Sequence, residues 1–262
     1  MTDLSITTIQ THLFWEDVDA NLAHFEEKIN AITSPTDIIV LPEMFTTGFT
    51  MNPKQLAEPH EGLGLRWMIQ KAQEKKCAIV GSISVQENAL FYNRLYWVNP
   101  DGSYMQYNKR HLFRMGNEHE YYTAGDQKII IDYKGWKICP LVCYDLRFPV
   151  WSRNTKNNAY DVLIYVANWP EVRSFTWKQL LIARAIENQS YVVGVNRIGV
   201  DGNEFKHSGD SCVLNPKGEL ISKTLASEDV TETVTISSSY IKEFRIAFPV
   251  LMDGDDFTVN SK

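Results

Sequence analysis

Four polar or reactive residues lie at the end of an apolar run of the sequence or directly after it. Glu43 follows DIIVLP, Cys143 closes ICPLVC, Asn168 follows VLIYVA and Asn196 follows YVVGV. Apolar, β-branched runs of this length are typical of buried strands. In layered α/β folds, reactive residues collect just past the carboxyl ends of strands. We therefore expect these side chains to gather in one region of the fold.

A cysteine, a carboxylate and a lysine together make a coherent set for acyl transfer. Lys109 lies in YNKRHLF, directly after a further predicted strand. A free thiol with a pKa of about 8.5 is a poor nucleophile at neutral pH until a base or a cation favours the thiolate. Glu43 can accept the proton of Cys143, and Lys109 can face the oxyanion that forms when sulfur attacks a carbonyl. Taken singly, these residues are also typical of a buried small side chain, a solvated loop acid and an exposed basic patch.

The elements that must position these residues alternate between strands and helices. Helical spacing of apolar residues predicts helices over Asp17–Ala31, Leu63–Glu74 and Phe175–Gln189, with Ser174 as the N-cap of the last. The predicted strands are Leu4–Gln10, Asp37–Leu41, Cys77–Val85, Leu95–Val98, Ile129–Asp132, Ile138–Cys143, Val162–Ala167, Tyr191–Asn196 and Ser211–Asn215. Several of these strands are apolar on both faces, which is typical of a sheet buried between layers. The sequence therefore predicts one α/β domain over residues 1–262, with helices packed on mixed sheets.

Composition and charge narrow the class of protein. The chain has 262 residues, of which 44% are hydrophobic, so it can bury a sizeable core. The net charge of −6 and the lack of a basic stripe argue against nucleic acid as a partner. No apolar run approaches the roughly 20 residues that span a bilayer, and the first residues lack a signal-peptide pattern. We expect a cytoplasmic protein that does not contact a membrane.

The cysteines and histidines do not predict a metal site. In a reducing compartment the four cysteines are expected to be free thiols, and none of them forms a CxxC pair. The six histidines show no zinc-ligand spacing beside a cysteine. We therefore expect no metal.

Three sequence blocks resemble the signatures of a known family. LPEMFTTGF surrounds Glu43, YNKRHLF surrounds Lys109 and LVCYDLRFPVWSR surrounds Cys143. In order and spacing these blocks are similar to those of the nitrilase, or carbon–nitrogen hydrolase, superfamily. The similarity runs along nearly the whole chain and includes VANWP and ARAIENQ. The cysteine block and the segment FRIAFPVLMDGDDF most resemble bacterial omega-amidases of the YafV type.

The resemblance implies a fold, an assembly and a set of catalytic roles. It implies a four-layer α-β-β-α sandwich with mixed sheets, a homodimer in which the tail of about residues 240–262 packs at the interface, and no cofactor. Glu43 would be the general base, Lys109 the oxyanion lysine and Cys143 the nucleophile. The backbone N–H of Tyr144 would be a second oxyanion donor. Glu118 matches a second active-site glutamate, although Glu120, two residues away, could take its place.

The resemblance also implies a substrate. Omega-amidases of this kind cleave the terminal amide of small 2-oxo dicarboxylic acid monoamides, such as 2-oxoglutaramate and 2-oxosuccinamate, through a cysteine thioester. The far carboxylate of such a substrate calls for a cation, preferably a guanidinium. Arg147 is the first candidate, although Asp145 or Asp161 could instead hold it in a structural ion pair. The other candidate substrate-binding residues are Arg114, Arg173, Phe113, Tyr144, Asn168 and Trp169.

Three other functions remain open from the sequence. The same fold could hydrolyse N-carbamoyl amides or nitriles. A cysteine–histidine pair could replace the Glu–Lys–Cys set, with His111, His119 or His207 as the base. The fold could also serve as an inactive binding scaffold, although such a role does not explain the presence of Glu43, Lys109 and Cys143 together.

Overall fold

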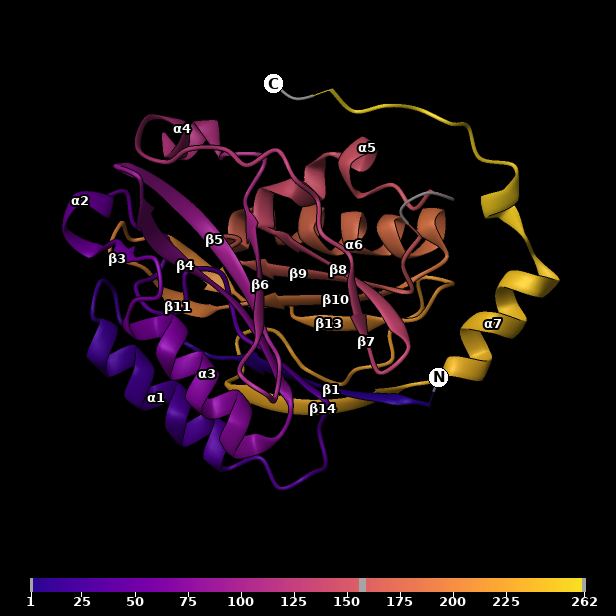
Figure 1. The fold of residues 1–262 in the computed structure, drawn as a ribbon, viewed down its shortest axis with the longest axis horizontal. Helices are drawn as coiled ribbons and strands as arrows, with labels where there is room; N and C mark the ends of the chain where they lie inside the picture. The colour runs from indigo at the N-terminus through magenta and orange to yellow at the C-terminus, as the bar shows by residue number, and fades with distance from the viewer. Residues whose placement is uncertain (1, 156–158, 261–262) are drawn as a thin grey trace.

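The molecule is built on two β-sheets that stack face to face (Figure 1). The computed structural model describes residues 2–155 and 159–260. The first sheet has the order β14-β1-β2-β4-β5-β6, and β3 pairs with β4 at one end. Its strands are β1 (Leu4–Gln10), β2 (Ile38–Val40), β3 (Glu58–Pro59), β4 (Ala78–Glu87), β5 (Leu90–Val98), β6 (Tyr104–Asn108) and β14 (Val230–Ile236).

The second sheet has the order β13-β10-β9-β8-β7. Its strands are β7 (Ile131–Tyr133), β8 (Trp136–Val142), β9 (Val162–Ala167), β10 (Tyr191–Asn196) and β13 (Cys212–Leu214). Strands β8, β9 and β10 are parallel, whereas β7 and β13 run antiparallel to their neighbours. A separate hairpin pairs β11 (Ile198–Val200) with β12 (Lys206–Ser208). Both large sheets are mixed, as the sequence predicted.

Helices cover the outer faces of the two sheets (Figure 1). The first sheet carries α1 (Val18–Asn30) and α3 (Leu63–Lys75), and the second carries α6 (Ser174–Asn188). Gly194 lets β10 and α6 approach closely, because a Cβ there would lie 2.6 Å from the side chain of Leu181. The remaining helices are α2 (Pro53–Leu56), α4 (Glu118–Tyr121), α5 (Pro149–Ser152) and α7 (Ser238–Ala247). Short 3-10 turns lie at Arg114–Gly116, Cys143–Arg147, Glu171–Arg173 and Val250–Met252.

Strand β2 shows why a continuous apolar run produces four layers. Ile38 and Val40 belong to the core between the two sheets. Ile39 and the following Leu41 belong to the core beneath α1 and α3. All four side chains are fully buried, because successive residues of a strand point to opposite faces. The α-β-β-α architecture and the α/β class predicted from the sequence are confirmed.

Most predicted elements lie where the sequence placed them. The strands Leu4–Gln10, Val162–Ala167 and Tyr191–Asn196 match to the residue. The predicted N-cap of α6 is wrong, because Ser174 is the first helical residue and no side chain caps that end. The sequence did not predict β14 or α7.

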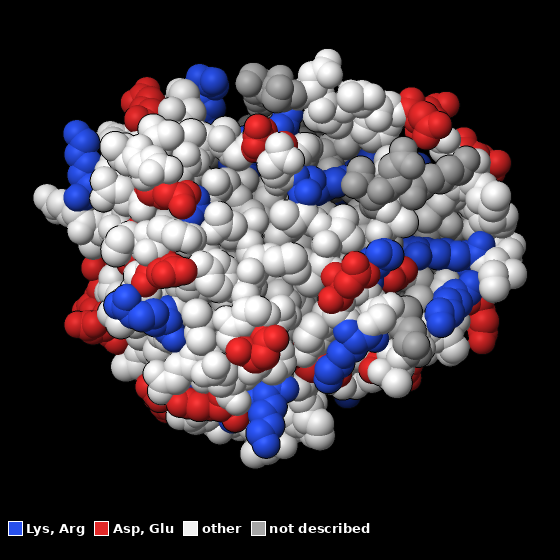
Figure 2. All heavy atoms as spheres, viewed as in Figure 1, with Lys and Arg blue, Asp and Glu red and all other residues white. Residues whose placement is uncertain are grey.

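The surface carries charges of both signs. On the face drawn in Figure 2, lysines and arginines alternate with acidic residues, and uncharged surface separates them. This face has no broad basic stripe of the kind that phosphate binding requires. Among the described residues, no helix is long and apolar enough to cross a membrane.

Candidate active site

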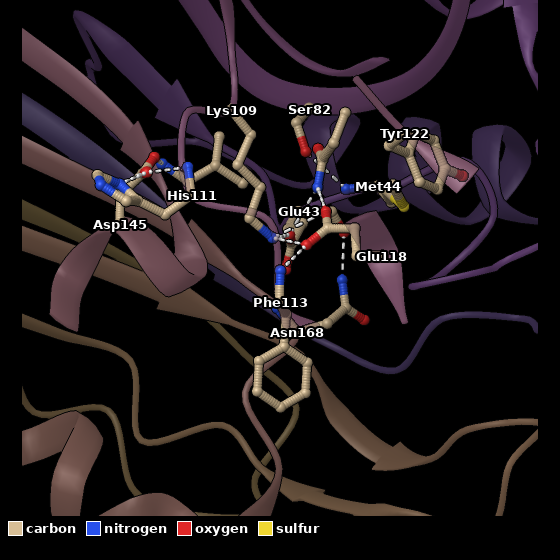
Figure 3. A network of polar contacts seen from close by, with 12 residues as sticks. Glu43, Met44, Ser82, Lys109, His111, Phe113, Glu118, Tyr122, Asp145 and Asn168 are labelled. Carbon is tan, nitrogen blue, oxygen red and sulfur yellow. Dashed lines mark hydrogen bonds and ion pairs between the residues drawn. The ribbon is translucent and has the colours of Figure 1, made fainter. Parts of the chain in front are cut away.

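Two strand ends of the first sheet and the start of α4 bring three ionisable side chains together in the interior (Figure 3). Glu43 lies just after β2, and Lys109 just after β6. Lys109 Nζ donates to Glu43 Oε1 at 2.8 Å and to Glu118 Oε2 at 2.9 Å. All three side chains are fully buried. One ammonium group therefore stands between two carboxylates, out of contact with bulk water.

Asn93 joins the two carboxylates from the neighbouring strand. Its Nδ2 donates to Glu43 Oε1 at 2.8 Å and to Glu118 Oε1 at 3.1 Å. The register explains its position, because Lys109 extends the β5–β6 pairing and its N–H donates to the carbonyl of Asn93 at 3.0 Å. Asn93 was not predicted as a site residue, because it lies inside β5 and not at the carboxyl end of a strand.

Asn168, which follows β9, holds Glu43 from the second sheet. Its backbone N–H donates to Glu43 Oε2 at 2.8 Å, and its side-chain amide donates to the carbonyl oxygen of Glu43. Donors therefore reach both carboxylate oxygens of Glu43, so the orientation of the carboxylate is fixed. Asn168 was expected to bind substrate, and the structure places its Nδ2 on Glu43. Its Oδ1 is buried and has no hydrogen-bond partner among the described residues.

Glu118 is the second glutamate of the cluster. Asn117, with φ +58°, turns the chain so that α4 begins with Glu118 pointing inward. Burial raises the pKa of the Glu118 carboxyl, and the charge of Lys109 opposes that shift. Burial alone would lower the pKa of Lys109, but Glu118 and Glu43 outweigh it and raise the pKa, so the ammonium stays charged. Glu120, the alternative considered from the sequence, is exposed.

Cys143 begins the 3-10 turn that follows β8. Its φ of +43° is a left-handed conformation that L-residues rarely adopt, so the surrounding structure must hold it there. The residue is 8% exposed and lines a cavity. Burial raises the pKa of the thiol well above its usual value; the charge of Glu43 adds to the shift and Lys109 opposes it. The resting cysteine is therefore a thiol with a carboxylate beside it that can accept its proton.

A second buried network holds the turn that carries Cys143. Asp145 accepts hydrogen bonds from the Val142 N–H at 3.1 Å, the His111 N–H at 3.0 Å and the Tyr107 hydroxyl at 2.8 Å. His111 Nδ1 lies 2.8 Å from Asp145 as well. The imidazole of His111 is thus engaged by Asp145 and stacks on Phe148, with 3.8 Å between the ring centroids.

The cavity beside Cys143 has a volume of about 340 Å³. Of the residues expected from the sequence, those that line it are Phe113, Cys143, Tyr144, Arg147, Asn168, Trp169 and Arg173. Arg114 is exposed and does not line the cavity. Lining residues that the sequence analysis did not select for substrate binding include Phe49, Met51, Met115, Asp201, Asn203, Phe205 and His207. Most of these lie in loops, where neither apolar periodicity nor the strand-end rule gives a signal.

Two guanidinium groups belong to the cavity wall. The Arg147 guanidinium lies 5.1 Å from the ring centroid of Trp169, and the Arg173 guanidinium lies 5.4 Å from that of Phe113. Burial lowers the pKa of Arg173, and the neighbouring charge of Arg147 adds to that shift. Within residues 2–155 and 159–260, Arg147 forms no ion pair. The structural ion pair considered for it is therefore wrong: Asp145 holds the turn, and Asp161 pairs with Arg245 at 2.6 Å.

The comparisons with known proteins agree with this geometry. Residues 5–246 match the family model of the carbon–nitrogen hydrolases. The chain is 47% identical over 257 residues to the omega-amidase YafV of Escherichia coli K12, covering 98% of this chain and 99% of that one. It is 33% identical over 253 residues to the 2-oxoglutaramate amidase of Bacillus subtilis 168, covering 95% and 96%.

A solved structure is also very similar. XC1258 of Xanthomonas campestris, described as a superfamily member with an arsenic adduct in the active site, superposes with a TM-score of 0.97 at 39% identity, covering 99% of this chain and all of that one. The chain belongs to the carbon–nitrogen hydrolase family. The predicted class of enzyme, an amide-cleaving hydrolase, is confirmed.

Proposed function

We propose that this enzyme hydrolyses the terminal amide of small 2-oxo dicarboxylic acid monoamides, such as 2-oxoglutaramate and 2-oxosuccinamate, to the acid and ammonia. Two neighbouring features carry the proposal. The first is the buried ion pair of Glu43 and Lys109 next to Cys143, and the second is the cavity lined by two guanidinium groups. The first provides acyl transfer, and the second suits an anionic substrate. The names of the relatives in Escherichia coli and Bacillus subtilis support the same substrate class.

The first half of the reaction forms a thioester. Glu43 accepts the thiol proton as the sulfur of Cys143 attacks the amide carbon. The ammonium of Lys109 and the N–H of Tyr144 stabilise the oxyanion; Tyr144 is the second residue of a 3-10 turn, where the first N–H groups have no partner within the turn. Glu43 then gives the proton to the leaving nitrogen, the C–N bond breaks, and ammonia departs.

The second half of the reaction releases the acid. Glu43 takes a proton from water as the water oxygen attacks the thioester carbon, and the same two donors hold the new oxyanion. The C–S bond breaks, the thiol regains its proton from Glu43, and the carboxylic acid leaves. Glu118 acts through Lys109, because its carboxylate keeps the ammonium charged and in place.

Arg147 and Arg173 bind the far carboxylate of the substrate in this proposal. Each guanidinium is held by an aromatic face, Trp169 or Phe113, which fixes its position without neutralising its charge. A planar guanidinium can bind a carboxylate through two parallel hydrogen bonds. This pair of cations favours an anionic amide over an uncharged nitrile or a neutral N-carbamoyl compound of the same size.

The assembly and the compartment belong to the same proposal. We infer a homodimer that uses the C-terminal segment, because apolar side chains there are exposed: Ile246 by 81%, Phe248 by 57% and Met252 by 70%. Burial of such a patch against a second copy is favourable. The four cysteines form no disulfide in the structure, which fits a reducing cytoplasm.

The test compares ammonia release by the wild type, Cys143→Ala and the double variant Arg147→Met, Arg173→Met. Rapid release from 2-oxoglutaramate by the wild type, lost in Cys143→Ala, is the expected result. The double variant should raise KM for 2-oxoglutaramate by at least about 100-fold, because each of the two charged hydrogen-bonding partners contributes about 1.5–3 kcal/mol. The matched control is an uncharged amide of the same length, whose kcat/KM should change little. If the wild type releases no ammonia from 2-oxoglutaramate, this substrate assignment is wrong.

A further inference from the structure

We propose that His12, His24 and Asp229 form a binding site for a divalent transition metal ion such as Zn²⁺, separate from the active-site cavity. His12 lies just past the end of β1, His24 lies in α1 and Asp229 lies just before β14. Each offers one ligand atom, and these atoms all lie within 4.8 Å of one another. None of the three residues lines the cavity beside Cys143.

The donor set suits a metal of borderline softness. Two imidazole nitrogens and a carboxylate oxygen are common ligands of Zn²⁺, Co²⁺ and Ni²⁺. Metal–ligand bonds of about 2.0–2.2 Å place the ligand atoms of a tetrahedral site roughly 3.3–3.6 Å apart. His12 Nδ1 already lies 3.8 Å from Asp229 Oδ2. Small side-chain rotations therefore complete a three-ligand site, with water in the remaining position.

The neighbouring imidazole rings give a second reason to place a cation here. The rings of His12 and His24 lie with their centroids 4.4 Å apart, and Phe14 contacts the edges or faces of both. Two imidazoles this close can share one metal ion. The His12 side chain is 42% exposed and that of Asp229 34% exposed, so an ion can enter from solvent.

Hydrogen bonds around the cluster would orient its ligands. Thr11 Oγ1 donates to Asp229 Oδ2 at 2.8 Å and lies 2.7 Å from His24 Nε2. Lys28 Nζ donates to Asp229 Oδ1 at 2.5 Å, on the carboxylate oxygen opposite the one that faces His12. Such outer contacts fix ligand orientation in metal sites. The positive charge of Lys28 also opposes a metal ion, so removal of that charge should tighten binding.

An ion at this site would link α1 and the loop before β14 to the hairpin that lines one side of the active-site cavity. His12 forms a parallel bridge with Ile198, the first residue of β11. The hairpin that begins there carries Asp201, Phe205 and His207 along the cavity. Metal binding therefore stabilises the base of that hairpin together with α1 and the loop before β14, and it should raise the thermal unfolding midpoint.

The experiment titrates Zn²⁺ and Co²⁺ into the full chain carrying Cys143→Ala, so that the active-site thiol cannot bind the metal. Calorimetry should find one ion per chain, and Co²⁺ should give visible d–d bands without a thiolate charge-transfer band. Adding His12→Asn and His24→Asn should weaken binding by at least about tenfold and abolish the rise in the unfolding midpoint. Lys28→Met should tighten binding.

The controls separate this site from other causes. His60→Asn changes a histidine outside the cluster and should leave metal affinity unchanged. With Cys143 intact and no added metal, ammonia release by the His12→Asn, His24→Asn variant should equal that of the wild type, which shows that the variant folds. Equal metal affinity with and without the two histidines would overturn the proposal, as would undetectable binding by the parent.

Discussion

Two buried polar networks flank Cys143, and they differ in how completely their acceptors are used. In the network of Asp145, the carboxylate receives four hydrogen-bonding contacts, from Val142, Tyr107 and twice from His111. In the network of Lys109, Glu118 likewise receives four, from Asn93, the N–H of Phe113 and twice from Lys109. Glu43 receives three, from Lys109, Asn93 and the N–H of Asn168. Glu43 is therefore the carboxylate with acceptor capacity left for the thiol of Cys143.

This difference separates a carboxylate that holds the backbone from a carboxylate that can transfer a proton. A saturated carboxylate such as Asp145 fixes the strained turn at Cys143 but is badly placed to take a proton. Glu43 lies beside a thiol and keeps acceptor capacity on its carboxylate, so it can accept a proton and return it. Both kinds of network are costly to bury, and only the one with spare acceptor capacity can do acid–base chemistry.

Glu43→Gln should have the largest effect on turnover of the substitutions that distinguish the two networks. The amide keeps the shape of the side chain but cannot act as a base, so kcat should fall about 10²–10⁴-fold. The new amide nitrogen faces a donor, but the substitution also relieves the repulsion between two carboxylates that share a single ammonium, so the free energy of unfolding should fall less than in Asp145→Asn. Steady-state ammonia release and thermal unfolding measure the two effects. The exposed Glu120→Gln serves as the control, and near-normal turnover by Glu43→Gln would exclude Glu43 as the base.

Asp145→Asn should instead act mainly on stability. The new amide nitrogen faces N–H or O–H donors whose hydrogen bonds the carboxylate oxygen had accepted. These donors lose their partner, so the free energy of unfolding should fall by about 3 kcal/mol. Urea unfolding followed by fluorescence measures the loss. Asp132→Asn is the matched control, because Asp132 is exposed and its ion pair with Lys137 should contribute little. A loss equal to that of the control would mean that the second network does not hold the turn.

The sequence predicted the layers and the strand-end residues for a clear physical reason. Strands such as DIIVLP are apolar on both faces, so only burial between two layers satisfies them. The rule that reactive residues follow such strands placed Glu43 and Cys143, which the structure brings next to Lys109. Most of the second sheet was predictable for the same reason.

Other features depend on contacts that local patterns do not encode. Asn93 lies within β5 and looks like an ordinary strand residue until β6 brings Lys109 opposite it. The turn that begins with the left-handed φ of Cys143 is held by Asp145 and its distant partners Tyr107 and His111. Residues from several loops meet only after the whole chain has folded, so lining residues such as Met115 and Phe205 could not be predicted.

Asn93→Ala should have a smaller effect on turnover than Glu43→Gln. It removes two hydrogen bonds to carboxylates, one to Glu43 and one to Glu118, but leaves the base and the ammonium in place. We expect kcat to fall about 10- to 100-fold, which corresponds to about 1.5–3 kcal/mol for a charged hydrogen bond. Asn93→Asp keeps the shape and adds a third negative charge, and it should be slower still. If Asn93→Ala changed only KM, Asn93 would not position the base.

The smallest expected effect concerns the pKa of Cys143 itself, and it has the opposite sign to the effect on turnover. The negative charge of Glu43 helps to raise the pKa of the thiol, while Lys109 lowers it. Glu43→Gln removes the first influence and leaves the second, so the pKa should fall. The measurement is the rate of Cys143 alkylation by iodoacetamide against pH, resolved from the other cysteines by peptide mass spectrometry. The variant should show its midpoint at lower pH than the wild type even though its turnover is lower. An unchanged midpoint would mean that Glu43 does not act on the thiol, and the acceptor capacity of Glu43 could not then explain the chemistry.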